Sequence, residues 1–110
     1  MSGLLVDGVR LNDEHVVLIV AKTAAETTAP FVIRANTSYT FICSELASDE
    51  EIQIEVYDPA LEDFTQLYDD GYAVKFAQNH HKLNFSNESM LIRIVKPITD
   101  ADVGVTVFYA

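Results

Sequence analysis

The segment Glu51–Asp58 constrains the fold of this 110-residue chain more than any other stretch. Its sequence, EIQIEVYD, places Ile52, Ile54 and Val56 at every second position. Because successive side chains of a strand point to opposite sides, this alternation predicts a β-strand with one buried and one solvated face. Pro59 then ends the strand, since proline lacks the N–H that a ladder needs. The rest of the chain must therefore supply partners that cover the apolar side.

Other short segments of β type recur along the chain and are separated by turn residues. We expect strands at residues 15–22, 31–35, 39–44, 64–68, 72–76, 83–85, 90–96 and 103–109. No segment keeps a helical period over three turns. This series predicts an all-β fold, an antiparallel β-sandwich of jelly-roll or Ig-like type with little or no helix.

Three details of this fold can be predicted from individual residues. His15–Lys22 is apolar and β-branched on both faces, which is typical of a central strand. Asp70-Gly71 predicts a hairpin turn in which Gly71 has a positive φ. The core should contain Ile92 and Ile94 together with the apolar positions of 51–58. Glu51, Gln53 and Glu55 should be exposed.

The domain organisation follows from length and from the loss of pattern at the N-terminus. A chain of 110 residues makes one domain, and we assign the sandwich to residues 15–110. Residues 1–14 have no persistent period, and Leu4, Leu5 and Val6 have no place in the later alternation. This segment is either an opening hairpin with Asp7-Gly8 at its turn or an arm or edge strand that orders against a partner. We favour the arm.

The charge and the termini narrow the possible partners and the location. The chain has 17 acidic and 7 basic residues, a net charge of −10 and a pI of about 4.4. Such a field repels phosphates and anionic membrane surfaces, so we expect no nucleic acid and no membrane as partner. The longest apolar run, Val16–Ala21, is far shorter than the roughly 20 residues that span a bilayer. The N-terminus lacks the features of a signal peptide, so synthesis in a cytoplasm is expected.

The sequence offers little catalytic chemistry. Cys43 is the only cysteine and alternates with apolar neighbours, which predicts a buried thiol. The rings of His80 and His81 should point apart in an extended chain and are better explained as a solvated loop than as metal ligands. The acidic residues between 58 and 70 are typical of solvated turns, with a structural calcium left open. No hydrolase or phosphate-binding motif is present. We therefore expect no enzyme, no cofactor and no metal site.

Exposed tyrosines are the stronger functional signal. Tyr57 lies on the polar face of its strand, and Tyr68 and Tyr72 lie near strand ends. Tyrosine tolerates both water and contact, so it is favoured at protein interfaces. A half-buried position at the sandwich rim explains them equally well. The predicted partner-binding residues are Leu4, Leu5, Val6, Tyr57, Tyr68 and Tyr72.

The second half of the chain resembles a known group of proteins. The segments that carry the resemblance are IQIEV at 52–56, FTQLY at 64–68, DGYAV at 70–74, RIVKPIT at 93–99 and VGV at 103–105. They resemble small virion structural proteins of tailed bacteriophages, of the head-decoration or fibre-associated type, over residues 51–110. One departure is Asn87-Glu88-Ser89, where that pattern would have a glycine turn.

This resemblance implies a non-enzymatic virion protein, of the capsid decoration, cement or head-fibre type. Such a protein binds capsid or tail proteins in several copies and forms a homo-oligomer, with a trimer among the expected states. It is made in the host cytoplasm and ends in the virion. Two alternatives remain from the residues themselves. One is a carbohydrate-binding β-sandwich module that uses its tyrosines. The other is an acidic cytoplasmic adaptor or inhibitor.

Overall fold

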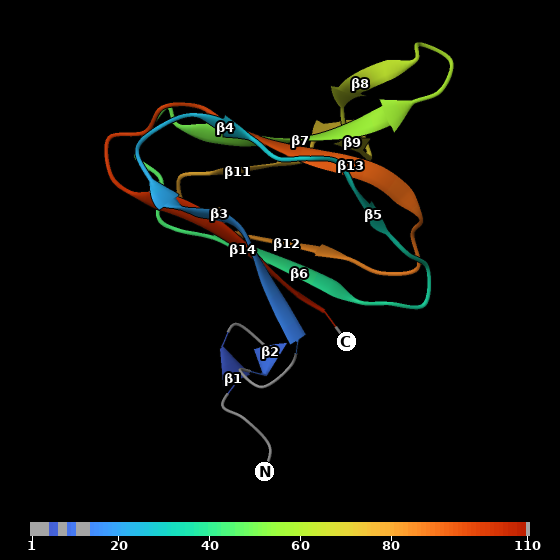
Figure 1. The fold of residues 1–110 in the computed structure, drawn as a ribbon. Coiled ribbons are helices and arrows are strands. Elements are labelled where there is room, and N and C mark those ends of the chain that lie inside the picture. Colours follow the sequence, from blue (N-terminus) through green and yellow to red (C-terminus); the bar gives the residue numbers. More distant parts are fainter. Residues whose placement is uncertain (1–4, 7–8, 11–13, 110) are drawn as a thin grey trace.

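The computed structural model describes residues 5–6, 9–10 and 14–109, and their regular structure is entirely β (Figure 1). Two antiparallel sheets face each other, with β7 and β13 of one sheet lying above β14 and β6 of the other. The strands are β1 (Leu5–Val6), β2 (Val9–Arg10), β3 (Glu14–Lys22), β4 (Glu26–Thr27), β5 (Phe31–Ile33), β6 (Tyr39–Cys43), β7 (Glu51–Asp58), β8 (Asp63–Gln66), β9 (Tyr68–Asp69), β10 (Tyr72–Ala73), β11 (Lys75–Ala77), β12 (Lys82–Phe85), β13 (Met90–Lys96) and β14 (Val103–Tyr109).

The strand order identifies the sandwich as a jelly roll. One sheet has the order β12-β6-β14-β3, and the other has β11-β7-β13-β4, with β5 also paired to β13 and β8 to β7. Four strands of the first half pair with strands of the second half in mirror order: β3 with β14, β5 with β13, β6 with β12, and β7 with β11. A chain folded back on itself and wound across two sheets is the jelly-roll arrangement. The prediction of an all-β antiparallel sandwich is confirmed, in its jelly-roll form.

The core lies between the two sheets, where the alternation of β7 predicts it. Ile52 and Ile54 are fully buried, and Ile92 and Ile94 of the neighbouring β13 are buried beside them. Phe41, Val105 and Val107 cover them from the opposite sheet. Val56 is only half-buried, because the sandwich ends near that residue. Full burial of one such side chain stabilises the fold by roughly 1.5–3 kcal/mol.

The outward side chains of β7 are less exposed than predicted. Glu51, Gln53 and Glu55 are half-buried: cations of neighbouring strands bind the two glutamates, and Gln53 donates to Glu51. Lys75 of β11 lies 2.6 Å from Glu51, measured between Nζ and Oε2. Arg93 of β13 lies 2.7 Å from Glu55, between Nε and Oε1. The predicted direction of these side chains is therefore right, and their predicted exposure is too high.

β3 is an edge strand, so its prediction as a central strand is wrong. It pairs only with β14 among the described strands, and the register shifts twice between Val103 and Thr106. At Gly104 the backbones come so close that a Cβ would lie 2.7 Å from the carbonyl oxygen of Ile19. An extra residue in one strand bends it and changes which face the next side chains occupy. The apolar run thus reflects a bulged strand.

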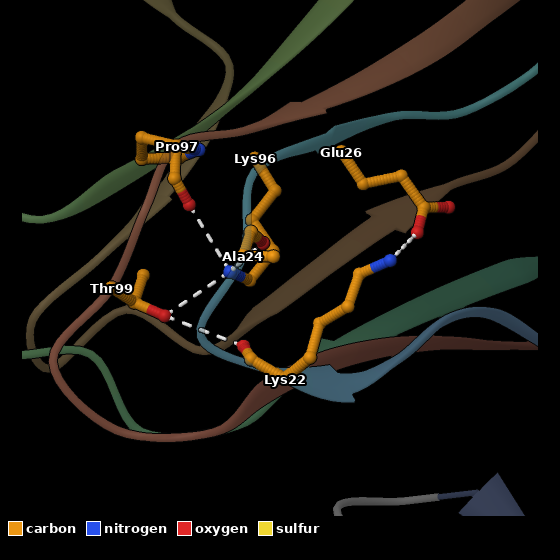
Figure 2. Close-up of polar contacts among 6 residues, drawn as sticks. All are labelled: Lys22, Ala24, Glu26, Lys96, Pro97 and Thr99. Carbon is orange, nitrogen blue, oxygen red and sulfur yellow. Dashed lines mark hydrogen bonds and ion pairs between the residues drawn. The ribbon is translucent and has the colours of Figure 1, made fainter.

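A buried lysine joins the loops at one end of the sandwich (Figure 2). Lys96 at the end of β13 is 1% exposed, and its ammonium donates to three oxygens. These are Ala24 O at 2.7 Å, Pro97 O at 3.1 Å and Thr99 Oγ1 at 3.1 Å. Burial lowers the pKa of Lys96, with Lys22 nearby adding to the effect. Three hydrogen bonds match the three donors of the ammonium, which makes its burial tolerable.

Glu50 fastens a third loop to the same end. Its carboxylate accepts hydrogen bonds from Ala47 N at 2.9 Å and Asp100 N at 2.7 Å. These two backbone bonds lower the pKa of Glu50. The loops that follow β3, β6 and β13 are therefore held together by polar contacts.

Candidate functional site

Tyr57 belongs to a packed cluster on the outer face of the β7 sheet. Its ring meets Phe64 of β8 edge-on, with centroids 5.4 Å apart. The guanidinium carbon of Arg93 lies 4.3 Å from the centre of the Phe64 ring, which is cation–π geometry. Glu55 binds the same guanidinium. Tyr57 is half-buried by these contacts and is not a free aromatic platform.

Tyr68 and Tyr72 lie on a small ribbon, β9–β10, that branches from the β7 sheet. They are 63% and 79% exposed. Tyr68 pairs with Ala73 across the ribbon and Tyr72 pairs with Asp69, so the two rings start from opposite faces. Asp70 and Gly71 both have positive φ, 54° and 85°, as a type I′ hairpin turn requires. The predicted Asp-Gly turn is confirmed, between strands shorter than predicted.

The ribbon is fastened to the middle of β7 by a polar network. Leu67 N donates to Ile54 O at 3.0 Å, and Ile54 N donates to Val74 O at 3.2 Å. Val74 N closes the base of the ribbon by donating to Leu67 O at 2.8 Å. The side-chain nitrogen of Gln66 lies within 3.1 Å of these same three carbonyl oxygens. Sequence reasoning missed Gln66, because its partners come from three separate segments.

A groove runs between this ribbon and the strand edges of β11 and β12. Its volume is about 440 Å³. Its lining combines apolar side chains with tyrosines and polar groups. These residues are Leu67, Tyr68, Asp69, Tyr72, Ala73, Val74, Lys75, Ala77, His80, Leu83, Asn84, Phe85, Glu88 and Met90. The structure thus places two of the predicted binding tyrosines at one groove.

An apolar surface lies on β3, at the opposite edge of the sandwich. Its exposed side chains are Val16, Val17 and Val20 (44%, 53% and 71%), with Val16 and Val17 on opposite faces of the strand. We call these three residues the valine edge. Sequence reasoning missed it, because a central position for β3 would have buried them. The ring of His15 lies beside it and packs on Phe108 at 5.6 Å.

The predicted binding residues of the N-terminal segment are only partly described. Leu5–Val6 and Val9–Arg10 pair with each other as two short antiparallel strands. This pairing matches the hairpin alternative, although Asp7 and Gly8 lie outside the described residues. Leu4 also lies outside them. In Figure 1, β1 and β2 lie beyond the start of β3, apart from the two main sheets.

The reactive side chains are poorly placed for chemistry. Cys43 is buried, as predicted, and burial raises the pKa of its thiol to about 12. The thiolate, the nucleophilic form, is therefore scarce at neutral pH. His80 is exposed, while His81 is half-buried and its Nδ1 has no hydrogen-bond partner within the described structure.

Over residues 5–6, 9–10 and 14–109, no three His, Cys, Asp or Glu residues gather as metal ligands would. The same residues contain no helix that is long and apolar enough to cross a membrane.

Comparisons with known proteins identify no family. No protein-family model matches the chain, and no curated protein matches it. Among solved structures, the chain is similar to the solution NMR structure of a de novo designed double-stranded beta-helix. The TM-score is 0.46 and the identity is 9%, over 90% of this chain and 99% of that chain. The jelly-roll assignment depends on the strand pairing of this chain itself.

Proposed function

We propose that this chain is a non-enzymatic virion structural protein of a tailed bacteriophage, of the decoration, cement or head-fibre type, which binds capsid or tail proteins in several copies. The observation that carries the proposal is the valine edge. Val17 and Val20 are more than half exposed on a strand at the rim of the sandwich. Exposed apolar groups gathered on one strand favour contact with another protein surface.

The bulges of β3 support a finite contact over an open-ended one. A regular edge strand can add further strands without limit, whereas bulges interrupt the row of backbone donors and acceptors. β3 carries two register shifts opposite Val103–Thr106. The valine edge would therefore bind a partner through its side chains and not through backbone pairing. Such a contact can join subunits in a closed ring or on a particle lattice.

Attachment in many copies needs little affinity from each copy. Full burial of an exposed valine is worth about 1.5–3 kcal/mol, and each valine of the edge, at 44–71% exposed, offers a part of that at an interface. Repeated contacts on a symmetric particle multiply such modest energies. We propose that Leu4, Leu5 and Val6, the binding residues that the sequence predicts in the N-terminal segment, add to this contact. The virion setting itself comes from the sequence resemblance of residues 51–110.

The experiment compares the full chain with a double variant, Val17→Asp/Val20→Asp, and with the control Leu61→Asp. Leu61 is 65% exposed but lies between β7 and β8, away from β3. Sedimentation velocity over a concentration series should show an oligomer for the wild type and the control, and a folded monomer for the double variant. An oligomer unchanged in the double variant would overturn the role of the valine edge.

The virion setting has its own test. Tailed-phage particles purified from the host that carries the gene should contain this chain by mass spectrometry. Electron microscopy of particles with and without the protein should show extra surface density only when it is present. Particles that contain none of it would overturn the setting, whatever the oligomeric state.

A further inference from the structure

The groove beside the β9–β10 ribbon has the volume of a small-molecule site and one wall that is held rigidly by hydrogen bonds. Its volume of about 440 Å³ falls within the roughly 300–1,000 Å³ typical of small-molecule sites. One wall is the ribbon, which Gln66, Leu67 and Val74 fasten to β7 by hydrogen bonds of 2.8–3.2 Å. A wall held in this way loses little freedom when a ligand binds, which favours affinity.

The two tyrosines at this groove differ from the other tyrosines of the domain. Tyr57 packs on Phe64, and Tyr39 and Tyr109 lie beside each other with ring centroids 6.4 Å apart. Tyr68 and Tyr72 are more exposed than Tyr39, Tyr57 and Tyr109. Among the described residues, neither ring packs against another aromatic ring. An exposed ring offers an apolar face to stack on and a hydroxyl that donates and accepts hydrogen bonds.

The polar groups of the lining exclude several ligand classes. Asp69 and Glu88 place carboxylates at the groove, and the chain has a net charge of −10, so phosphates and other anions would be repelled. Lys75 does not offset this, because its ammonium binds Glu51 at 2.6 Å. A lipid chain would cover the carboxylates of Asp69 and Glu88 without offering them a hydrogen-bond donor, which is costly.

The remaining class is a neutral ligand with both an apolar face and many hydroxyls. Sugar rings have a face of C–H groups that stacks on tyrosine. Their hydroxyls donate to carboxylates and accept from amide and imidazole donors, such as those of Asn84 and His80. We propose that this groove binds a neutral oligosaccharide that stacks on Tyr68 or on Tyr72, whose rings leave opposite faces of the ribbon. The groove and the valine edge lie on opposite edges of the sandwich, so this inference is independent of the virion proposal.

The test screens the full chain against an array of neutral oligosaccharides and then measures the strongest by saturation-transfer NMR and calorimetry. We expect binding that weakens roughly tenfold in Tyr72→Ala or in Tyr68→Ala, whichever ring forms the stacking face, as the loss of one aromatic contact predicts. Val20→Thr, on the valine edge, serves as the control and should bind as the wild type does. Backbone amide spectra verify that each variant is folded.

Three outcomes would overturn the proposal. One is the absence of binding to any neutral oligosaccharide on the array. A second is binding that both tyrosine variants retain in full. A third is a preference for an apolar probe such as a fatty acid, or for inorganic phosphate, at this groove. None of these outcomes affects the oligomer or particle experiments, so the two proposals fail separately.

Discussion

The outer faces of the two sheets are built in opposite ways. On the β7–β13 face, Glu51 binds Lys75, Glu55 binds Arg93, and Arg93 lies over the ring of Phe64. On the β3–β14 face, Val17 and Val20 are exposed, and Val17 has uncharged neighbours that include Ile42 and Thr106. The first face pairs these charged groups within the chain. The second leaves apolar area in water, which is why we place protein contacts there and not on the charged face.

The largest effect should come from the core that both faces share. Ile54→Ala removes a side chain that is 0% exposed, so it should lower the free energy of unfolding by about 2–5 kcal/mol. Gln53→Ala, one residue away on the charged face, should cost less than about 1 kcal/mol. Urea denaturation of both variants measures the difference. Equal losses would show that the inward and outward sides of β7 are not distinct.

A second comparison sets the buried lysine against a lysine of the charged face. Lys96→Met leaves Ala24 O, Pro97 O and Thr99 Oγ1 without their donor and should cost about 1–3 kcal/mol. Lys75→Met breaks a partly exposed ion pair, which is worth only about 0.2–1 kcal/mol. Chemical denaturation at neutral pH distinguishes them. A larger loss for Lys75→Met would mean that the charged face carries more stability than its geometry indicates.

Acid should weaken the ion pair between Glu51 and Lys75 on the charged face. The hydrogen bond from Lys75 holds the pKa of Glu51 below its ordinary value of 4.5. A carboxyl with a depressed folded-state pKa stabilises the fold above its unfolded-state pKa, and this contribution is lost as the pH falls through the folded value. The wild type should therefore exceed Glu51→Gln in unfolding free energy at about pH 7, and the difference should shrink toward about pH 3. A difference that does not vary with pH would contradict this assignment.

The smallest effect on stability should come from the valine edge. Val17→Thr exchanges a methyl for a hydroxyl at a position that is 53% exposed, so the dilute monomer should change by no more than about 0.5 kcal/mol. The measurement is thermal unfolding at a concentration below that of self-association. A loss above about 1 kcal/mol would show that Val17 belongs to the core of its own subunit.

Alternation and turn chemistry were sufficient to predict much of this fold. The period of two in β7 predicted the buried isoleucines, and Asp70-Gly71 predicted the ribbon turn, because both depend on residues adjacent in sequence. Strand order depends on long-range pairing, which periodicity does not specify. A bulged edge strand and a strand buried on both faces give the same apolar run, so β3 was placed wrongly.

The candidate sites were predictable only in part. Tyr68 and Tyr72 were identified from their place near strand ends, and the structure brings them to one groove. Tyr57 was identified in the same way, but its partner Phe64 is set by the pairing of β7 with β8. Gln66 and Lys96 gave no local signal, since their partners are carbonyl groups of distant segments. The valine edge required the position of β3, which only the folded chain reveals.

The mirrored pairing of the two halves also sets the order of events during synthesis. β3 is made early, yet its partner β14 ends at Tyr109, which pairs with Glu14. During translation, β3 therefore cannot pair with β14 until almost the whole domain has left the ribosome. Folds with such distant pairings fold in roughly milliseconds to seconds, which is slow for a small domain. We therefore expect the nascent chain to be exposed to aggregation at the same strand through which the finished protein is proposed to assemble.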